Sequence, residues 1–220
     1  MSGDINLFYT RHRPPLRVLF TALAKTRATG TAWMPPTGGV VLACNHLCWL
    51  DPWLLGALFP RQLFFMAKQE LFEIKPLGWY LRHAGTFPVR RGAGDRSAIR
   101  HAEELLRQGE VVMMFPEGHR SKTMGAQAAR AGAVLLAART NSPILPVGIS
   151  GTERLRVKQL PSLLVRLPFG RPAVRVNVGE PIWLGNSGRG AGKKQAADLV
   201  MRRIVDLLPP AYHGVYAEEA

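Results

Sequence analysis

The sequence predicts an α/β fold, in which a largely parallel mixed sheet is flanked by helices and preceded by an N-terminal amphipathic helical segment. Short apolar runs alternate along the chain with longer segments of helical spacing, and this alternation predicts the sheet. The first 30 residues differ, because a short apolar stretch there lies between Arg and Lys residues. We therefore expect residues 1–30 to be the helical segment and residues 31–220 to be the α/β domain.

The N-terminal segment is too short in its apolar part, residues 16–24, to cross a membrane. On helical spacing four apolar side chains share one face and three basic ones lie towards the other: Leu16, Leu19, Phe20 and Leu23 against Arg17, Lys25 and Arg27. Such a helix either packs on the domain or lies on an anionic lipid surface. The formal net charge of +14 favours the second interpretation, a peripheral protein with no spanning helix.

The domain begins with a predicted strand at 38–44, which is apolar and β-branched. Asp51 and Pro52 then predict a helix start, with aspartate as the cap and proline in the first turn. A second strand is expected at 62–68. The helical pattern that follows, 70–85, is interrupted by a proline.

The remaining elements continue the alternation. Strands are predicted at 86–90, 110–115, 143–150 and 172–182. Helices are predicted from about 95 to 109, at 126–140 and at 193–208. Residues 184–194 are rich in glycine and predict a loop before the last helix.

Composition narrows the classes of function. The apolar fraction of 47% excludes a disordered chain, and 29 Lys and Arg against 15 Asp and Glu favour an anionic partner. Phospholipid, a phosphorylated substrate and nucleic acid all fit that charge, but no basic surface with interleaved aromatic residues is evident, so nucleic acid is not expected. Two cysteines four residues apart do not staple a domain, which predicts a reducing compartment, on the cytoplasmic side of the membrane.

Polar residues follow four of the predicted strands at the point where each one ends. They are Asn45 and His46, then Lys68, then Arg90 and Arg91, and finally Glu117 and Gly118. In open α/β sheets ligands bind beyond the carboxyl ends of the strands. We therefore expect these side chains to meet at one rim.

His46 and Asp51 predict a general base and the acid that orients it, because the carboxylate is placed to reach one ring nitrogen. The chain has no Gly-x-Ser-x-Gly motif, so the attacking hydroxyl would come from a substrate. Two other interpretations stay open for the pair alone: a core histidine beside a helix cap, and a metal site formed with Cys44 and Cys48.

The second compact motif is "FPEGHRS", residues 115–121. Gly118 permits a close backbone approach, and its N–H is a candidate donor to an oxyanion, with Glu117 and Arg120 beside it. An alternative interpretation of the same motif is a strand-to-loop turn that carries a surface ion pair.

"NHLCWLD", "GTFPVRR", "FPEGHRS" and "PILPV" resemble, in order and spacing, the four sequence blocks of the glycerolipid acyltransferases, which include the 1-acylglycerol-3-phosphate acyltransferases. The resemblance covers residues 45–147. It implies an O-acyltransferase that takes its acyl group from acyl-coenzyme A or acyl-carrier protein, needs no other cofactor, and acylates a lysophospholipid at an anionic membrane surface.

The resemblance also implies roles for single residues. His46 would be the base and Asp51 its orienting acid, in the block that Asn45 opens. Arg91, with Arg90 and Lys68 beside it, would bind the acceptor's phosphate. The other positions belong to the third and fourth blocks: Glu117 and Gly118 for the glycerol portion, Arg120 as that block's arginine, and Pro146 on the acyl-donor side.

Three positions depart from the usual blocks, Pro88, Cys48 and His119, and they leave the acceptor open. A relative that acylates glycerol 3-phosphate or another lysolipid or alcohol remains an alternative. So does a non-catalytic module that binds anionic lipid by charge alone.

Overall fold

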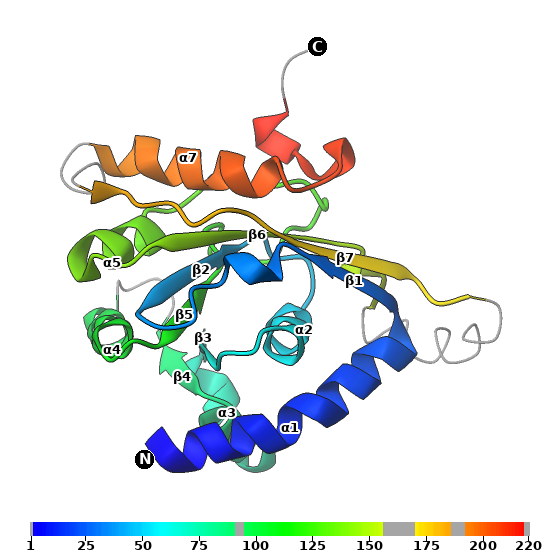
Figure 1. The fold of residues 1–220 in the computed structure, drawn as a ribbon, viewed down its shortest axis with the longest axis vertical. Helices are drawn as coiled ribbons and strands as arrows, with labels where there is room; N and C mark the ends of the chain where they lie inside the picture. The colour runs from blue at the N-terminus through cyan, green and yellow to red at the C-terminus, as the bar shows by residue number, and fades with distance from the viewer. Residues whose placement is uncertain (1, 91–94, 156–169, 186–191, 218–220) are drawn as a thin grey trace.

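The computed structural model describes residues 2–90, 95–155, 170–185 and 192–217 (Figure 1). Its seven strands form one sheet in the order β1-β7-β6-β2-β5-β3-β4. Only the β6–β7 pair is antiparallel among these neighbours, which confirms the predicted largely parallel mixed sheet. The strands are β1 Lys25–Thr29, β2 Val40–Cys44, β3 Leu63–Lys68, β4 Thr86–Val89, β5 Val111–Met114, β6 Ile144–Ser150 and β7 Ala173–Val178.

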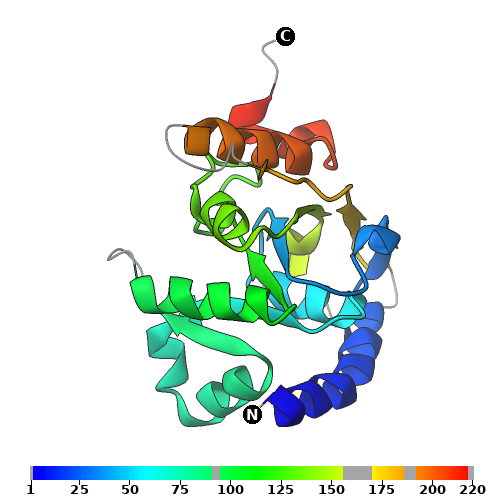
Figure 2. The same cartoon turned by 60° about the vertical axis from the view of Figure 1, so that its left-hand side comes forward.

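Helices cover both faces of the sheet. They are α1 Ser2–Leu23, α2 Asp51–Leu58, α3 Lys75–His83, α4 Arg96–Arg107, α5 Gly132–Thr140 and α7 Lys193–Val205. Alternate residues of β2 point to opposite faces, as its period of two requires. Val40 and Leu42 join a core with α1 and α2, whereas Val41 and Ala43 join one with α4, α5 and α7. Figures 1 and 2 show α7 and α1 on opposite sides of the sheet.

The strands β6, β2, β5, β3 and β4 run parallel to one another, so their carboxyl ends share one edge. Short 3-10 turns continue the chain at two of these ends, η2 Gln69–Phe72 after β3 and η3 Thr152–Leu155 near β6. The fold therefore forms the rim that the strand-end residues predict.

The N-terminal helix differs from its predicted extent. It begins at Ser2, continues through Pro14 and Pro15, and ends at Leu23. The prediction that the helical segment reaches residue 30 is wrong, because Lys25–Thr29 is strand β1, paired with β7 along five residues. Leu19 was expected on the packed face but is 47% exposed. Within the described residues, no helix combines the length and the apolar character that crossing a bilayer requires.

The alanine-rich helix also starts later than predicted, at Gly132 instead of residue 126. The preceding backbone N–H groups donate to distant segments instead of within a helix of their own: Ala126 donates to Tyr212 O, and Arg130 donates to Pro116 O. The predicted loop at 184–194 lies mostly outside the described residues.

Candidate active site

His46 and Asp51 are in direct contact at the rim. His46 follows β2 by two residues, and Asp51 is the first residue of α2. His46 Nδ1 lies 2.8 Å from Asp51 Oδ2, and the same oxygen accepts the backbone N–H groups of Leu47 and Cys48 at 2.8 Å each. Asp51 is fully buried. Three donors contact one oxygen of its carboxylate, Oδ2.

This geometry excludes the helix-cap interpretation of Asp51. The N-cap of α2 is Leu50, and no side chain caps the helix. The Asp51 carboxylate instead reaches back to the residues that precede α2. The sequence Asn-His-x4-Asp therefore folds into a loop that closes on its own aspartate.

The His46 ring is fixed on its other side by Phe115, which follows β5. The two rings stack with centroids 3.8 Å apart and planes 14° apart. The His46 side chain is 11% exposed, and Nε2 has no hydrogen-bond partner in the described part of the chain. One ring nitrogen therefore contacts the acid, and the other remains available to a substrate.

Glu117 supports the loop that carries His46. It is 1% exposed, and its carboxylate accepts the backbone N–H of His46 at 3.1 Å and that of Gln127 at 3.2 Å. Burial raises the pKa of Glu117 to about 7, the two N–H donors oppose that rise, and the negative charge of Asp51 adds to it. Ser121 N–H also donates to His46 O at 2.8 Å, so the third sequence block frames the first.

Gly118 does not offer its N–H to a substrate. That N–H donates to Phe115 O at 2.9 Å and closes a turn, so the expected oxyanion donor is wrong. The turn explains the residue type, because Gly118 has φ +74° and an added Cβ would lie 2.9 Å from Arg130 Nε. Arg120 is exposed after this turn, and its positive charge acts to lower the pKa of Cys48, which places Arg120 near the first block.

Two cationic residues, Lys68 and Arg90, lie at the carboxyl ends of the neighbouring strands β3 and β4. Lys68 pairs in register with Val89, the residue before Arg90, and both cations are exposed. Arg90 Nε donates to Gln69 Oε1 at 2.8 Å, and Arg82 lines the same polar depression as Arg90. Arg91 lies outside the described residues.

Asn45 and Pro146 are buried, Asn45 directly after β2 and Pro146 within β6. The Asn45 side chain is 2% exposed and pairs twice with Ile149, donating to its O at 2.9 Å and accepting from its N–H at 2.7 Å. Both polar atoms are thus engaged, and they tie the start of the His46 loop to β6. Pro146 is a buried residue within β6, just before the first β6–β7 pair, Val147 with Val178. It pairs in register with Ala43 of β2, and its carbonyl accepts the Gly179 N–H at 2.9 Å.

The two cysteines are free and buried. Burial raises the pKa of both thiols, which makes either one a poor nucleophile. Cys44 belongs to the hydrophobic core that the sheet forms with α1 and α2. Across the described residues, no three His, Cys, Asp or Glu side chains converge as metal ligands would.

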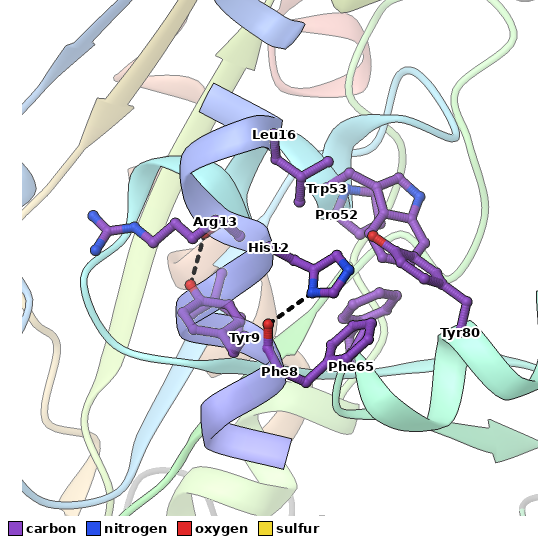
Figure 3. A pocket seen from close by; sticks show the side chains of 12 residues that line it. Phe8, Tyr9, His12, Arg13, Leu16, Pro52, Trp53, Phe65 and Tyr80 are labelled. Carbon is purple, nitrogen blue, oxygen red and sulfur yellow. Dashed lines mark hydrogen bonds between the residues drawn. The ribbon is translucent and has the colours of Figure 1, made fainter. Parts of the chain in front are cut away.

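An apolar pocket lies between α1 and the domain (Figure 3). Its cavity volume is small, about 30 Å³. Pro52 and Trp53 line it directly after Asp51, and Phe8, Leu16 and Phe65 are among the residues around it. Tyr9 OH lies within 3.1 Å of the carbonyls of Gly56, Phe59 and Arg61, so it fastens α1 to the carboxyl end of α2.

The sequence patterns missed several of these supports. Gln127 contributes only a backbone N–H, which no residue type reveals. Phe115 is the first residue of the motif "FPEGHRS", but the apolar residues before it are typical of a strand and gave no sign of its contact with His46. The partners of Asn45 and Tyr9 lie 104 and 47 to 52 residues away in sequence.

Comparisons with known proteins point to one family. The model of the Acyltransferase family matches residues 25–150. The 1-acyl-sn-glycerol-3-phosphate acyltransferase of Bacillus subtilis is 32% identical over 168 residues, which are 76% of this chain and 78% of that protein. The enzyme of the same name from Streptococcus pneumoniae is 33% identical over 144 residues, 64% of this chain and 49% of that protein.

A lyso-ornithine lipid O-acyltransferase of Pseudomonas aeruginosa is 38% identical over a shorter stretch of 95 residues, 43% of this chain and 35% of that protein. The crystal structure of the 1-acyl-sn-glycerophosphate acyltransferase PlsC from Thermotoga maritima has a TM-score of 0.68 at 24% identity. The structural alignment covers 93% of this chain and 77% of the PlsC chain, which shows that the two share a fold. Since the family model matches 126 of the 220 residues, and the Bacillus subtilis relative is 32% identical over 78% of its length, the chain belongs to the Acyltransferase family.

Proposed function

We propose that this acyltransferase moves an acyl chain from a thioester to the free hydroxyl of 1-acylglycerol 3-phosphate, which makes phosphatidic acid for phospholipid synthesis. The observation that carries the proposal is the contact of 2.8 Å between His46 Nδ1 and the buried Asp51 carboxylate. A fixed imidazole with one nitrogen on an acid is the usual base for a hydroxyl. The names of the Bacillus subtilis and Streptococcus pneumoniae relatives support this acceptor.

His46 Nε2 takes the proton from the acceptor hydroxyl as its oxygen attacks the thioester carbonyl carbon. Asp51 stabilises the imidazolium that forms, since its carboxylate already contacts the Nδ1 side of the ring. The carbon–sulfur bond then breaks, and the imidazolium returns the proton to the leaving thiolate. The reaction needs no acyl-enzyme and no cofactor besides the thioester co-substrate, acyl-coenzyme A or acyl-carrier protein.

The acceptor's phosphate would lie on the cations beyond β3 and β4. Lys68 and Arg90 are exposed there on neighbouring strands, and Arg91 follows Arg90 in the chain. Charge-assisted hydrogen bonds of this kind are stronger than neutral ones, and arginine matches a phosphate with two donors at once. Arg120, near Cys48 on the third block, adds a further positive charge at the rim.

An acyl chain would enter the pocket beneath α1, and the pocket's volume of about 30 Å³ requires α1 to move outward to admit the chain. The pocket's lining is mostly apolar and aromatic, and it starts one residue after Asp51, at Pro52. The thioester end of a chain that enters there would lie towards Pro52, the residue that follows Asp51 (Figure 3). The outward face of α1 combines exposed Leu7, Val18 and Leu19 with exposed Arg11 and Arg17.

That face supports peripheral binding to an anionic membrane, on the cytoplasmic side that free cysteines fit. Sedimentation with phosphatidylglycerol vesicles tests it. Arg11→Glu with Arg17→Glu should lower the bound fraction, whereas Arg203→Glu, an exposed arginine of α7, should not. Equal losses in both would contradict docking through α1.

A second acceptor has one specific observation in its favour, the 38% identity to the lyso-ornithine lipid O-acyltransferase. The activity test therefore offers purified protein each lysolipid in detergent, with acyl-coenzyme A and acyl-carrier protein in separate reactions. Thiol release that depends on 1-acylglycerol 3-phosphate supports the proposed function and identifies the donor. Release with lyso-ornithine lipid alone would replace the acceptor, and no release in any reaction would remove the proposal.

A further inference from the structure

The chain's C-terminal segment, residues 209–217, lies on the loop that connects Glu117 with α5. We refer to this segment as the C-terminal clasp; it includes the short turns η8 Pro210–Tyr212 and η9 Gly214–Tyr216. Ala126 N–H donates to Tyr212 O at 2.9 Å, and Val215 N–H donates to Ala126 O at 3.0 Å. Ala129 N–H donates to the Tyr216 hydroxyl at 3.0 Å.

Two glycines make this contact possible. Gly214 has φ +55°, and a Cβ added to it would lie 2.2 Å from Ala126 O. A Cβ added to Gly125 would lie 2.7 Å from Gly214 Cα. The two backbones therefore touch at positions where no other residue fits, which makes the contact a specific one.

The clasp is itself anchored to two elements of the domain. The Tyr216 hydroxyl donates to Asp198 Oδ1 of α7 at 3.0 Å. The Tyr212 hydroxyl donates to Glu153 Oε1 at 3.0 Å and accepts Gly151 N–H at 3.2 Å, directly after β6. The clasp thus fixes the loop relative to α7 and to the edge of the sheet that carries the site.

Gln127 lies between the two clasped residues of the loop, Ala126 and Ala129. Its N–H donates to Glu117 Oε2 at 3.2 Å, and Glu117 Oε1 accepts the His46 N–H at 3.1 Å. Tyr216 is therefore connected to the backbone of the proposed base by the hydrogen bond to Ala129, the covalent backbone from Ala129 to Gln127, and the two hydrogen bonds of Glu117.

We propose that the C-terminal clasp positions the active site, and that Tyr216 is a positioning residue that acts on Glu117 through Gln127. The inference rests on the proposed function for its effect on activity, but its effect on Glu117 is measurable without any turnover. An ionised Glu117 accepts both N–H groups, whereas a protonated one carries an O–H that competes with one of them. The clasp therefore favours the ionised form, in which the His46 loop is held at both oxygens.

The charged and titratable groups around Glu117 give the direction of the effect. Asp51 and the Cys44 thiol face it from α2 and β2, His46 follows β2, and Arg130 covers the neighbouring Gly118. The Gln127 N–H lowers the pKa of Glu117 against burial and the charge of Asp51. Loosening the clasp weakens that bond, so the pKa of Glu117 should rise.

Tyr216→Phe tests the inference, because it keeps the ring and removes the hydroxyl. Carboxyl ¹³C NMR of labelled protein should show the pKa of Glu117 raised by about half to one unit, the effect of one hydrogen bond. The acid limb of the kcat–pH profile should move to higher pH with it. Below the pKa, kcat should fall by about three- to tenfold, and at pH 9 it should recover to the wild-type value. Tyr212→Phe should shift both readouts in the same direction.

Thr140→Val is the matched control. It removes a hydroxyl that bonds Leu136 O and Ser142 Oγ at 2.8 Å each, on α5 and away from the loop. A folded Tyr216→Phe protein with an unchanged pKa of Glu117 would overturn the inference. A loss of activity that is equal at every pH would also overturn it. Such a uniform loss is what reduced stability alone would give in the Thr140→Val control. If Tyr216→Phe raised the pKa of Glu117 but the wild-type protein had no acyltransferase activity, the inference about the C-terminal clasp would stand and the proposed function would be wrong.

Discussion

His46 and Asp51 form a buried hydrogen bond of 2.8 Å between Nδ1 and Oδ2, and Asp51 Oδ2 also accepts two backbone N–H groups. Asp51→Asn keeps the shape of this side chain but removes its charge. The imidazolium that forms during transfer then has no counter-charge. We expect kcat to fall by about 10²- to 10⁴-fold, the range for a correctly oriented general base. The assay is acceptor-dependent thiol release, and a kcat within about twofold of wild type would contradict the role of Asp51.

Glu117→Gln tests the buried carboxyl through stability. The pKa of Glu117 is about 7 in the folded protein, against an ordinary value of 4.5. Between these values the folded state holds more protons than the unfolded state, so stability falls as pH rises through this window, by about 3 kcal/mol in total. The glutamine variant cannot titrate, so its free energy of unfolding in urea should lose this decline between pH 5 and 8.

The exposed Glu73→Gln variant serves as its control and should keep the wild-type pH dependence. If Glu117→Gln and wild type declined equally over this range, Glu117 would not be the group that titrates.

The phosphate site is tested with Lys68→Met and Arg90→Met. Each substitution keeps an aliphatic side chain and removes one cation from the rim. We expect KM for 1-acylglycerol 3-phosphate to rise by about tenfold for each, since a charge-assisted bond contributes about 1.5–3 kcal/mol. Lys75→Met, on the exposed start of α3, is the control. If KM were unchanged in both rim variants, the acceptor's phosphate would not bind at Lys68 and Arg90.

Gly56→Leu tests whether the pocket beneath α1 holds an acyl chain. A Cβ at Gly56 would lie 3.9 Å from the Tyr9 ring, an ordinary contact, so Gly56→Ala is a tolerated control. The longer leucine side chain would extend into the pocket. We expect the preference to shift to acyl donors or acceptors with shorter chains, measured in competition between chain lengths. An unchanged preference would place the chain outside this pocket.

The strands and the rim were predictable because their signals are local. The runs that form β2, β3 and β5 are apolar over four to six residues, and the polar residues that follow them stand at fixed places in the sequence. The His46–Asp51 contact spans only five residues, so the spacing made it one of the open interpretations, and the resemblance to the acyltransferase blocks favoured it.

The parts that the sequence did not reveal depend on distant partners. Strand β1 is polar and mostly exposed, so it lacks an apolar pattern and exists because it pairs with β7, about 148 residues later. Residues 126–131 have good helix formers, but tertiary hydrogen bonds to Glu117 and Tyr212 override that propensity. The role of Tyr216 rests on a backbone N–H 87 residues away.

The most direct test of the central claim compares wild type with His46→Ala and Cys48→Ala in one assay of phosphatidic acid formation. His46 is the proposed base, whereas burial raises the pKa of the Cys48 thiol and leaves it unsuited to attack. The account predicts that the histidine variant loses activity by at least about 10²-fold and that the cysteine variant retains it. A His46→Ala protein as active as wild type would contradict the mechanism, and loss with Cys48→Ala alone would indicate an acyl-enzyme in its place.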